Sequence, residues 1–182
     1  MANDDLARLT LPVGARDHAQ GPAGAPVTLV EYGDYECPHC GRAYPIVQEV
    51  QRRLGSTLRF VFRNFPLAES HPHAEHAAEA AASADADGRF WEMPDTLFEH
   101  QQALLDPHLI GDATAVGLDA TVFENELRAH THKARVREDF TSGVRSGVNG
   151  TPTFFINGVR FDESWDPETL TKALLLVARH PR

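Results

Sequence analysis

Cysteine is scarce in this chain, since only Cys37 and Cys40 occur among its 182 residues. Two cysteines are too few for the disulfide framework that holds many small secreted domains together. The sequence also lacks an apolar run long enough to span a bilayer, and residues 1–10 lack the apolar segment of a secretory signal. The cytoplasm is therefore the expected location of the chain as it stands. A mature exported chain with a new initiator methionine would also lack a secretory signal.

Basic residues are also in short supply. Lys and Arg number 17 against 26 Asp and Glu, which gives a formal net charge of −9 at pH 7. Nucleic acids and anionic membranes attract basic surfaces, so neither is expected as the main partner. Apolar side chains, by contrast, make up 42% of the sequence. That is enough for the core of one domain with a sizeable insertion.

The two cysteines lie three positions apart, in Cys37-Pro-His-Cys40. Before them, the β-branched apolar run at 27–32 predicts a buried strand, and after them apolar residues recur at helical spacing over 46–54. The pair should therefore stand where a strand turns into a helix. Unsatisfied N–H groups and the helix dipole at such a point favour a thiolate, the reactive form of cysteine. A C-x-x-C in this setting predicts a thiol–disulfide redox site.

The remaining sequence predicts the order of the other elements. A strand is expected at 57–65, which completes a strand–helix–strand unit, and the pattern over 67–148 is helical throughout. Two strands and a helix then follow. This order predicts an α/β fold in which one domain, formed by 1–66 and 149–182, encloses an all-helical insertion at 67–148.

Local signals mark the ends of several elements. Asn157-Gly158, between two apolar runs, is the strongest short-range signal of a hairpin. Asp119 and Asp166 are expected as N-caps of helices. Alternating apolar residues at 9–13 predict a short edge strand near the start of the chain.

Several motifs together resemble one known family, the DsbA-like thiol:disulfide oxidoreductases. Cys37-Pro38-His39-Cys40 is similar to the active-site tetrapeptide of this family, and Glu31 stands at the place of its buried acid. Gly150 to Gly158 is similar to the cis-proline loop and hairpin. The helical insertion of the single-domain members is matched by two segments, His71-Pro72-His73-Ala74 and Phe90-Trp91-Glu92-Met93. The resemblance extends over roughly 20–178 of the sequence and implies a thioredoxin fold with a helical insertion.

The resemblance also implies a role for each residue of the motif. Cys37 would be the exposed nucleophile, and Cys40 the resolving thiol one turn further along the helix. His39 would donate a hydrogen bond or a charge to the Cys37 thiolate. Glu31 would be a half-buried acid that takes the proton from Cys40. The alternative for Glu31 is that it points into solvent from its strand.

Substrate contacts are implied for Thr151, Pro152 and Pro38. Pro152 is expected to follow a cis peptide bond, and the Thr151 backbone to pair with an extended substrate segment. Glu36 departs from the family pattern, because an apolar residue precedes the motif in DsbA. A carboxylate beside Cys37 disfavours the thiolate, so we expect an oxidising pair that is less oxidising than DsbA.

No metal and no cofactor is expected besides the redox-active Cys37–Cys40 pair. A structural zinc site needs four ligands, and the sequence has no second C-x-x-C. The spacing of His71, His73 and His76 would suit a metal, but histidines at a helix start more often face solvent.

The expected activity is disulfide exchange with thiol- or disulfide-containing proteins or with small thiols, and with a redox partner that the sequence does not identify. The direction of electron flow stays open, because a cytosolic reductase or isomerase would carry the same motifs. A glutathione transferase of the kappa class shares the fold but has serine in place of Cys37. A non-catalytic binding module is the third alternative.

Overall fold

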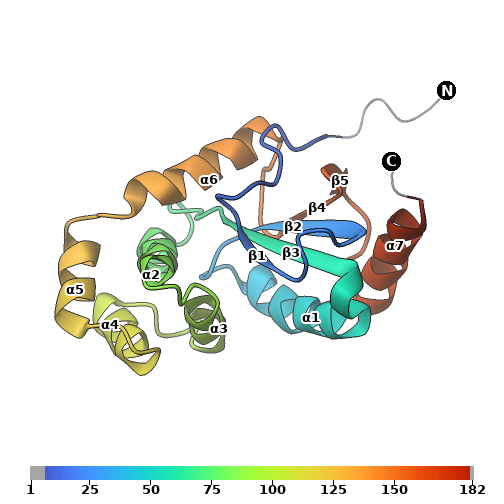
Figure 1. Cartoon of the computed structure of the whole chain (residues 1–182). Helices are drawn as coiled ribbons and strands as arrows, with labels where there is room; N and C mark the ends of the chain where they lie inside the picture. The colour runs from blue at the N-terminus through green and yellow to red at the C-terminus, as the bar shows by residue number, and fades with distance from the viewer. Residues whose placement is uncertain (1–6, 181–182) are drawn as a thin grey trace. The chain divides into compact units, whose positions relative to one another are not determined.

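The computed structural model describes residues 7–180 (Figure 1). Part of the expectation for residues 1–10 therefore lies outside the described residues. The elements in chain order are β1 (His18–Gln20), β2 (Val27–Gly33), α1 (Pro38–Leu54), a 3₁₀ turn (Gly55–Thr57), β3 (Leu58–Asn64), α2 (Ala74–Ala86), α3 (Glu92–Glu99), α4 (Asp106–Ala115), α5 (Ala120–Arg128), α6 (Lys133–Arg145), β4 (Thr153–Ile156), β5 (Val159–Phe161) and α7 (Pro167–Arg179).

The five strands form one sheet in the order β1-β3-β2-β4-β5. Strand β4 pairs antiparallel with β2, with Glu31 opposite Phe154, and β5 pairs antiparallel with β4. Asn157 and Gly158 join β4 to β5 with φ angles of 46° and 80°. Both values lie in the left-handed region that a two-residue hairpin turn of this kind requires. The hairpin predicted from Asn157-Gly158 is confirmed.

The expected edge strand at 9–13 is wrong. Arg8 forms a single bridge with Val159, and the strand that pairs with β3 is β1, with His18 opposite Phe62. The backbone of this segment bonds to side chains instead. The Thr10 N–H donates to Ser146 Oγ at 3.0 Å, and the carbonyls of Leu11 and Pro12 accept hydrogen bonds from Arg63 at 3.0 Å and 3.3 Å. These backbone groups are therefore satisfied without pairing to a strand.

The chain divides into two compact units, which we describe separately. The first comprises Met1–Gly33, Arg42–Arg63 and Thr141–Arg182, and the second comprises Asp34–Gly41 and Asn64–Phe140. The first unit contains the sheet, and within it α7 packs against β2. The second contains helices α2 to α5 and also the Cys37–Cys40 motif, which the sequence had assigned to the sheet domain.

The first unit contains a buried ion pair between Arg63 of β3 and Asp17. Arg63 is fully buried, and its Nε donates to Asp17 Oδ1 at 2.8 Å while Nη2 donates to Oδ2 at 3.1 Å. Its Nη1 also donates to the Tyr32 hydroxyl at 2.9 Å. Burial opposes the charge, but hydrogen bonds to Asp17 and Tyr32 outweigh it and raise the pKa of Arg63. The segment before β1 is thereby fixed to the sheet.

The second unit is built around helix α2, which packs against α3, α4 and α5. The helix is rich in alanine, and small side chains let neighbouring helices approach closely. Its buried alanines are Ala74, Ala77, Ala78, Ala80, Ala81, Ala82 and Ala84. The Asp119 side chain accepts hydrogen bonds from the N–H groups of Thr121 and Val122, so the expected N-cap of α5 is confirmed.

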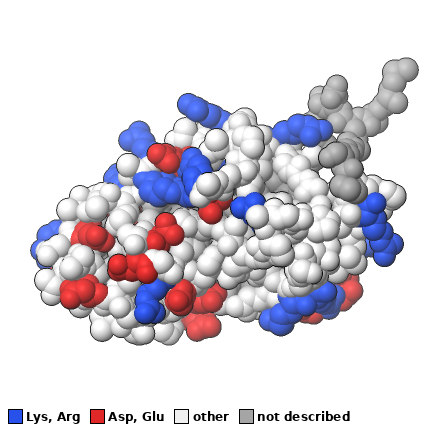
Figure 2. Space-filling view, in the orientation of Figure 1, with Lys and Arg blue, Asp and Glu red and all other residues white. Residues whose placement is uncertain are grey.

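Acidic side chains outnumber basic ones in the chain, 26 to 17. On the face that Figure 2 shows, Asp and Glu side chains gather over the helical unit, at the left of the view. Within residues 7–180, no helix combines the length and the hydropathy needed to cross a membrane.

Candidate active site

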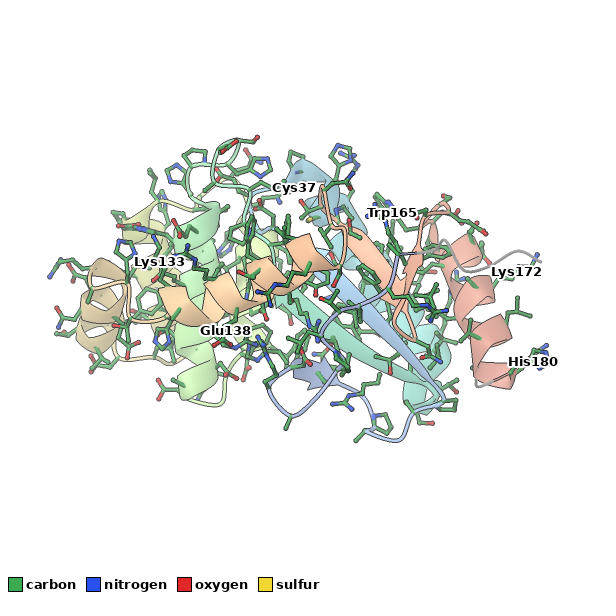
Figure 3. The ribbon with its side chains drawn as sticks, turned by 90° about the horizontal axis from the view of Figure 1, so that it is seen from above. Cys37, Lys133, Glu138, Trp165, Lys172 and His180 are labelled. Atoms are coloured by element: carbon green, nitrogen blue, oxygen red, sulfur yellow. The ribbon has the colours of Figure 1, made fainter. Side chains whose placement is uncertain are left out.

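The Cys37–Cys40 motif stands where strand β2 gives way to helix α1, as predicted. Pro38 is the first residue of α1, a position where its missing N–H costs nothing and its fixed φ favours the helix. The Cys37 carbonyl accepts a hydrogen bond from the Gly41 N–H at 3.0 Å, and the Cys37 N–H donates to the Asp34 carbonyl at 3.2 Å. Figure 3 shows Cys37 at the N-terminal end of α1.

Both thiols are buried, and they differ in their surroundings. Cys40, in the first turn of α1, is fully buried, and its Sγ accepts a hydrogen bond from the Asp34 N–H at 3.4 Å. Cys37 is only 4% exposed, so the expectation of an exposed nucleophile is wrong in this structure. Pro38 and His39 instead form the solvent-facing part of the motif.

Gln101, just beyond α3, holds the backbone on which Cys37 lies. Its Nε2 donates to the Tyr35 carbonyl and to the Cys37 carbonyl, each at 2.8 Å. The Tyr35 ring also packs on Phe98 of α3, with the ring centroids 5.0 Å apart. Gly41 makes this arrangement possible, because a Cβ there would stand 2.3 Å from Gln101 Oε1. Nothing local in the sequence marks Gln101 as part of the site.

Asp34 organises the other side of the motif. Its carboxylate is buried and accepts hydrogen bonds from the Glu36 N–H and the Leu67 N–H, each at 2.8 Å. Its Oδ2 also lies 2.7 Å from His71 Nδ1. The residue therefore joins the loop before Cys37 to the segment before α2. No motif or spacing in the sequence predicts this role for Asp34.

His71 is the group beside Cys37 whose protonated form is favoured by its surroundings. Burial opposes its protonation, but the hydrogen bond and charge of Asp34, with smaller contributions from Cys37 and Glu36, raise the pKa of His71. The attraction is mutual, so a protonated His71 favours the thiolate of Cys37. Glu36, which the sequence indicated as an opposing charge, accepts a hydrogen bond from the His73 N–H at 2.7 Å.

The remaining predicted site residues lie in the first unit. Glu31 is 3% exposed in β2, which excludes the alternative that it points into solvent. The Thr151–Pro152 peptide bond is cis, as expected, and lies directly before β4. That Glu31 and Pro152 meet Cys40 in one site stays a prediction. So do the assigned roles of His39, Thr151 and Pro38.

Comparison with known proteins shows the family of the chain. A family model described as Thioredoxin matches residues 15–175. The chain belongs to the thioredoxin family. Among solved structures, BdbD from Bacillus subtilis has a TM-score of 0.86 at 22% identity and covers 97% of this chain and 100% of its own. MdbA from Corynebacterium diphtheriae, a thiol-disulfide oxidoreductase, has a TM-score of 0.70 at 15% identity, over 93% and 92% of the chains. The expected DsbA-like thioredoxin fold is confirmed.

The thioredoxin-family chain also matches part of a group of larger proteins. A protein named Na(+)/H(+) antiporter NhaA 1 from Salinispora arenicola is 43% identical over 173 residues, which are 94% of this chain and 26% of that protein. A protein of the same name from Mycobacterium sp. (strain KMS) is 45% identical over 87% of this chain and 26% of its own length. The chain thus spans about a quarter of the length of these relatives.

Proposed function

We propose that this protein is a thiol:disulfide oxidoreductase that exchanges disulfides with proteins through Cys37 and Cys40. The observation that carries the proposal is the position of the two thiols. Cys37 directly precedes the first residue of α1, and Cys40 lies in the first turn with its Sγ bound by the Asp34 N–H. Membership of the thioredoxin family supports the proposal. So do structural neighbours that are named as thiol-disulfide oxidoreductases.

The proposed reaction proceeds in two exchanges. The Cys37 thiolate attacks a substrate disulfide, so that a bond forms between Cys37 Sγ and one substrate sulfur while the substrate S–S bond breaks and releases a thiolate. Cys40, once it has lost its proton, attacks Cys37 Sγ, forms the Cys37–Cys40 disulfide and releases the second substrate thiolate. The substrate gains two electrons and the protein loses two. The same steps in reverse oxidise a substrate dithiol.

The supporting residues take roles that follow from their chemistry. In this proposal Glu31 accepts the proton that Cys40 loses, since it is a buried carboxylate on the strand that leads into the motif. His39 and His71 stabilise the Cys37 thiolate by hydrogen bonding and charge. The Thr151 backbone, with Pro152 and Pro38, receives an extended segment of the substrate.

The direction of exchange follows from how strongly the reduced form is stabilised. The helix N-terminus and a protonated His71 favour the thiolate, which makes the disulfide more oxidising, whereas Glu36 opposes it. We therefore expect a reduction potential between the glutathione poise, about −220 to −260 mV, and the value of DsbA, about −120 mV. Equilibration with glutathione buffers measures it. A potential below about −260 mV favours a cytosolic reductase instead.

Turnover with insulin and dithiothreitol tests the reaction class. Wild-type protein should accelerate insulin reduction, and Cys37→Ser should lose the acceleration completely. Conjugation of glutathione to an electrophile that survives in Cys37→Ser would instead favour an enzyme like the kappa-class transferases. Absence of exchange and conjugation activity in the wild type, with a binding function that is intact in Cys37→Ser, would leave only a binding module.

The identity to segments of proteins named Na(+)/H(+) antiporters favours a second, compatible role. In this role the chain works with an antiporter domain. Disulfide exchange by the chain changes the transport rate of that antiporter domain. The test is Na⁺/H⁺ exchange in vesicles that contain the antiporter, measured with the oxidised chain, the reduced chain and Cys37→Ser. A rate that does not depend on the redox state of Cys37 would contradict this role.

A further inference from the structure

Helix α2 carries a second cluster of side chains with ligand chemistry, formed by His76, Glu79 and His130. His76 and Glu79 lie three residues apart and therefore on one face of the helix. His130 comes from the connection between α5 and α6, 51 residues beyond Glu79. One potential ligand atom from each of the three lies within 4.8 Å of the other two.

The buried carboxylate of Glu79 is only partly satisfied. Its side chain is 1% exposed, and Oε1 lies 2.9 Å from His130 Nδ1. Its Oε2 is buried and has no hydrogen-bond partner among the described residues. Lys133, at the start of α6, pairs with Glu75 instead, at 3.0 Å. A buried carboxylate oxygen without a partner is costly, and a cation is the partner that such an oxygen would bind most strongly.

The ring of His76 is held by a carboxylate at the start of α4. Its Nδ1 lies 2.7 Å from Oδ1 of Asp106, the first residue of α4. A carboxylate that binds one ring nitrogen fixes the tautomer and leaves the other nitrogen for a metal, an arrangement typical of metal-binding histidines. The rings of His76 and His130 have centroids 5.2 Å apart, so both imidazoles lie beside the carboxylate of Glu79.

We propose that His76, Glu79 and His130 form a binding site for a divalent transition metal, with Zn²⁺ as the best match. Two imidazoles and one carboxylate suit zinc, whereas Ca²⁺ and Mg²⁺ prefer ligand sets made of oxygen alone. Three protein ligands leave a fourth position for water. A bound ion would join α2 to the connection between α5 and α6, and so stabilise the helical unit.

The site differs from the histidine group that the sequence indicated. Of His71, His73 and His76, only His76 belongs to it, because His71 binds Asp34 beside the thiols. His130 escapes a sequence search because it lies 51 residues beyond Glu79 and follows no local spacing. The alternative is that His130 and Glu79 form a plain hydrogen-bonded pair with no affinity for metal.

Zinc titration by calorimetry tests the proposal. Cys37→Ser/Cys40→Ser protein, stripped with a chelator, removes the competing thiols while the proposed ligands stay intact. We expect one Zn²⁺ per chain and a Tm that rises on binding. Glu79→Gln and His130→Ala should each weaken binding by more than about 100-fold, and Asp106→Asn by about 10- to 100-fold. Co²⁺ absorption offers a second measurement, since it reports the ligand geometry directly.

His100→Ala is the matched control. His100 Nδ1 likewise lies 2.8 Å from an aspartate oxygen, Asp112 Oδ1, but His100 does not belong to the three-ligand cluster. This variant should bind zinc like the parent protein. If Glu79→Gln does not fold, His130→Ala is the deciding variant. The His130 side chain is 44% exposed, so its removal should not prevent folding. Absence of zinc binding to the parent, or equal affinity in His130→Ala, would overturn the proposal.

Discussion

Substitution of Gly41 by alanine should change stability with opposite signs, depending on whether residue 101 is glutamine or alanine. A Cβ at position 41 would stand 2.3 Å from Gln101 Oε1 and 2.9 Å from its Cδ. The Gln101 side chain can move aside, but it then loses its two hydrogen bonds to the carbonyls of Tyr35 and Cys37. Gln101 can therefore bind the carbonyls of the active-site loop only because residue 41 has no side chain.

The magnitudes decide the signs. Each of the two hydrogen bonds contributes about 0.5–1.5 kcal/mol, so their joint loss costs about 1–3 kcal/mol. Glycine to alanine in a helix gains about 0.5–1 kcal/mol. In the wild type, Gly41→Ala should therefore lower the free energy of unfolding by up to about 2.5 kcal/mol. In Gln101→Ala protein no bond remains to be lost, and the same change should stabilise by up to about 1 kcal/mol.

Urea unfolding of the four reduced proteins completes this double-mutant cycle. The expected coupling between the two positions is about 1–3 kcal/mol, the joint contribution of the two bonds. Gly111→Ala is the matched control, because Gly111 lies in α4 and a Cβ there meets nothing within 4 Å. It should stabilise both backgrounds equally. An additive cycle for Gly41 and Gln101, with coupling below about 0.5 kcal/mol, would refute the reasoning.

Two further predictions concern buried charges. Asp17→Asn leaves Arg63 as an uncompensated buried charge and should cost about 3–5 kcal/mol in urea unfolding at neutral pH. Burial opposes the charge of Asp17, but Arg63 holds the pKa of Asp17 below its usual value, so this stabilisation should be lost as the pH falls below about 4. A constant difference from the wild type down to about pH 2 would contradict it. The raised pKa of His71 gives the opposite pH dependence of stability. We compare Cys37→Ser protein with the same protein that also carries His71→Asn. The difference in the free energy of unfolding should be complete below about pH 6.5 and should decline above it. A difference that stays flat between about pH 5.5 and 8.5 would show that Asp34 does not stabilise the protonated form of His71.

Local rules were sufficient for much of the fold. The position of Cys37 at a helix start, the N-cap Asp119 and the Asn157-Gly158 turn each depend on residues within a few positions of one another. Such features follow from backbone preferences and from unsatisfied N–H groups, which a sequence displays directly. The strand expected at 9–13 failed because backbone groups of this segment bond to the side chains of Ser146 and Arg63, which are distant in the sequence and which the apolar pattern does not reveal.

The side chains that support the site could not be predicted in this way. Asp34 and His71 are 37 residues apart, and Gln101 reaches the Cys37 carbonyl across 64 residues. Such pairs form only once the helical insertion has folded, and neither partner carries a spacing that identifies the other. The burial of Cys37 has the same origin, because it depends on the groups packed around the motif rather than on the motif itself.

The most direct test of the central claim is whether a mixed disulfide accumulates on Cys37 when Cys40 is absent. Reduced Cys40→Ser and Cys37→Ser proteins are mixed with a disulfide-containing peptide at neutral pH, and the adducts are followed by mass spectrometry. The account predicts a peptide adduct on Cys37 in Cys40→Ser protein and hardly any adduct in Cys37→Ser protein, whose remaining thiol is fully buried. Equal adducts in the two variants, or none in Cys40→Ser protein, would contradict the assignment of Cys37 as the attacking thiol.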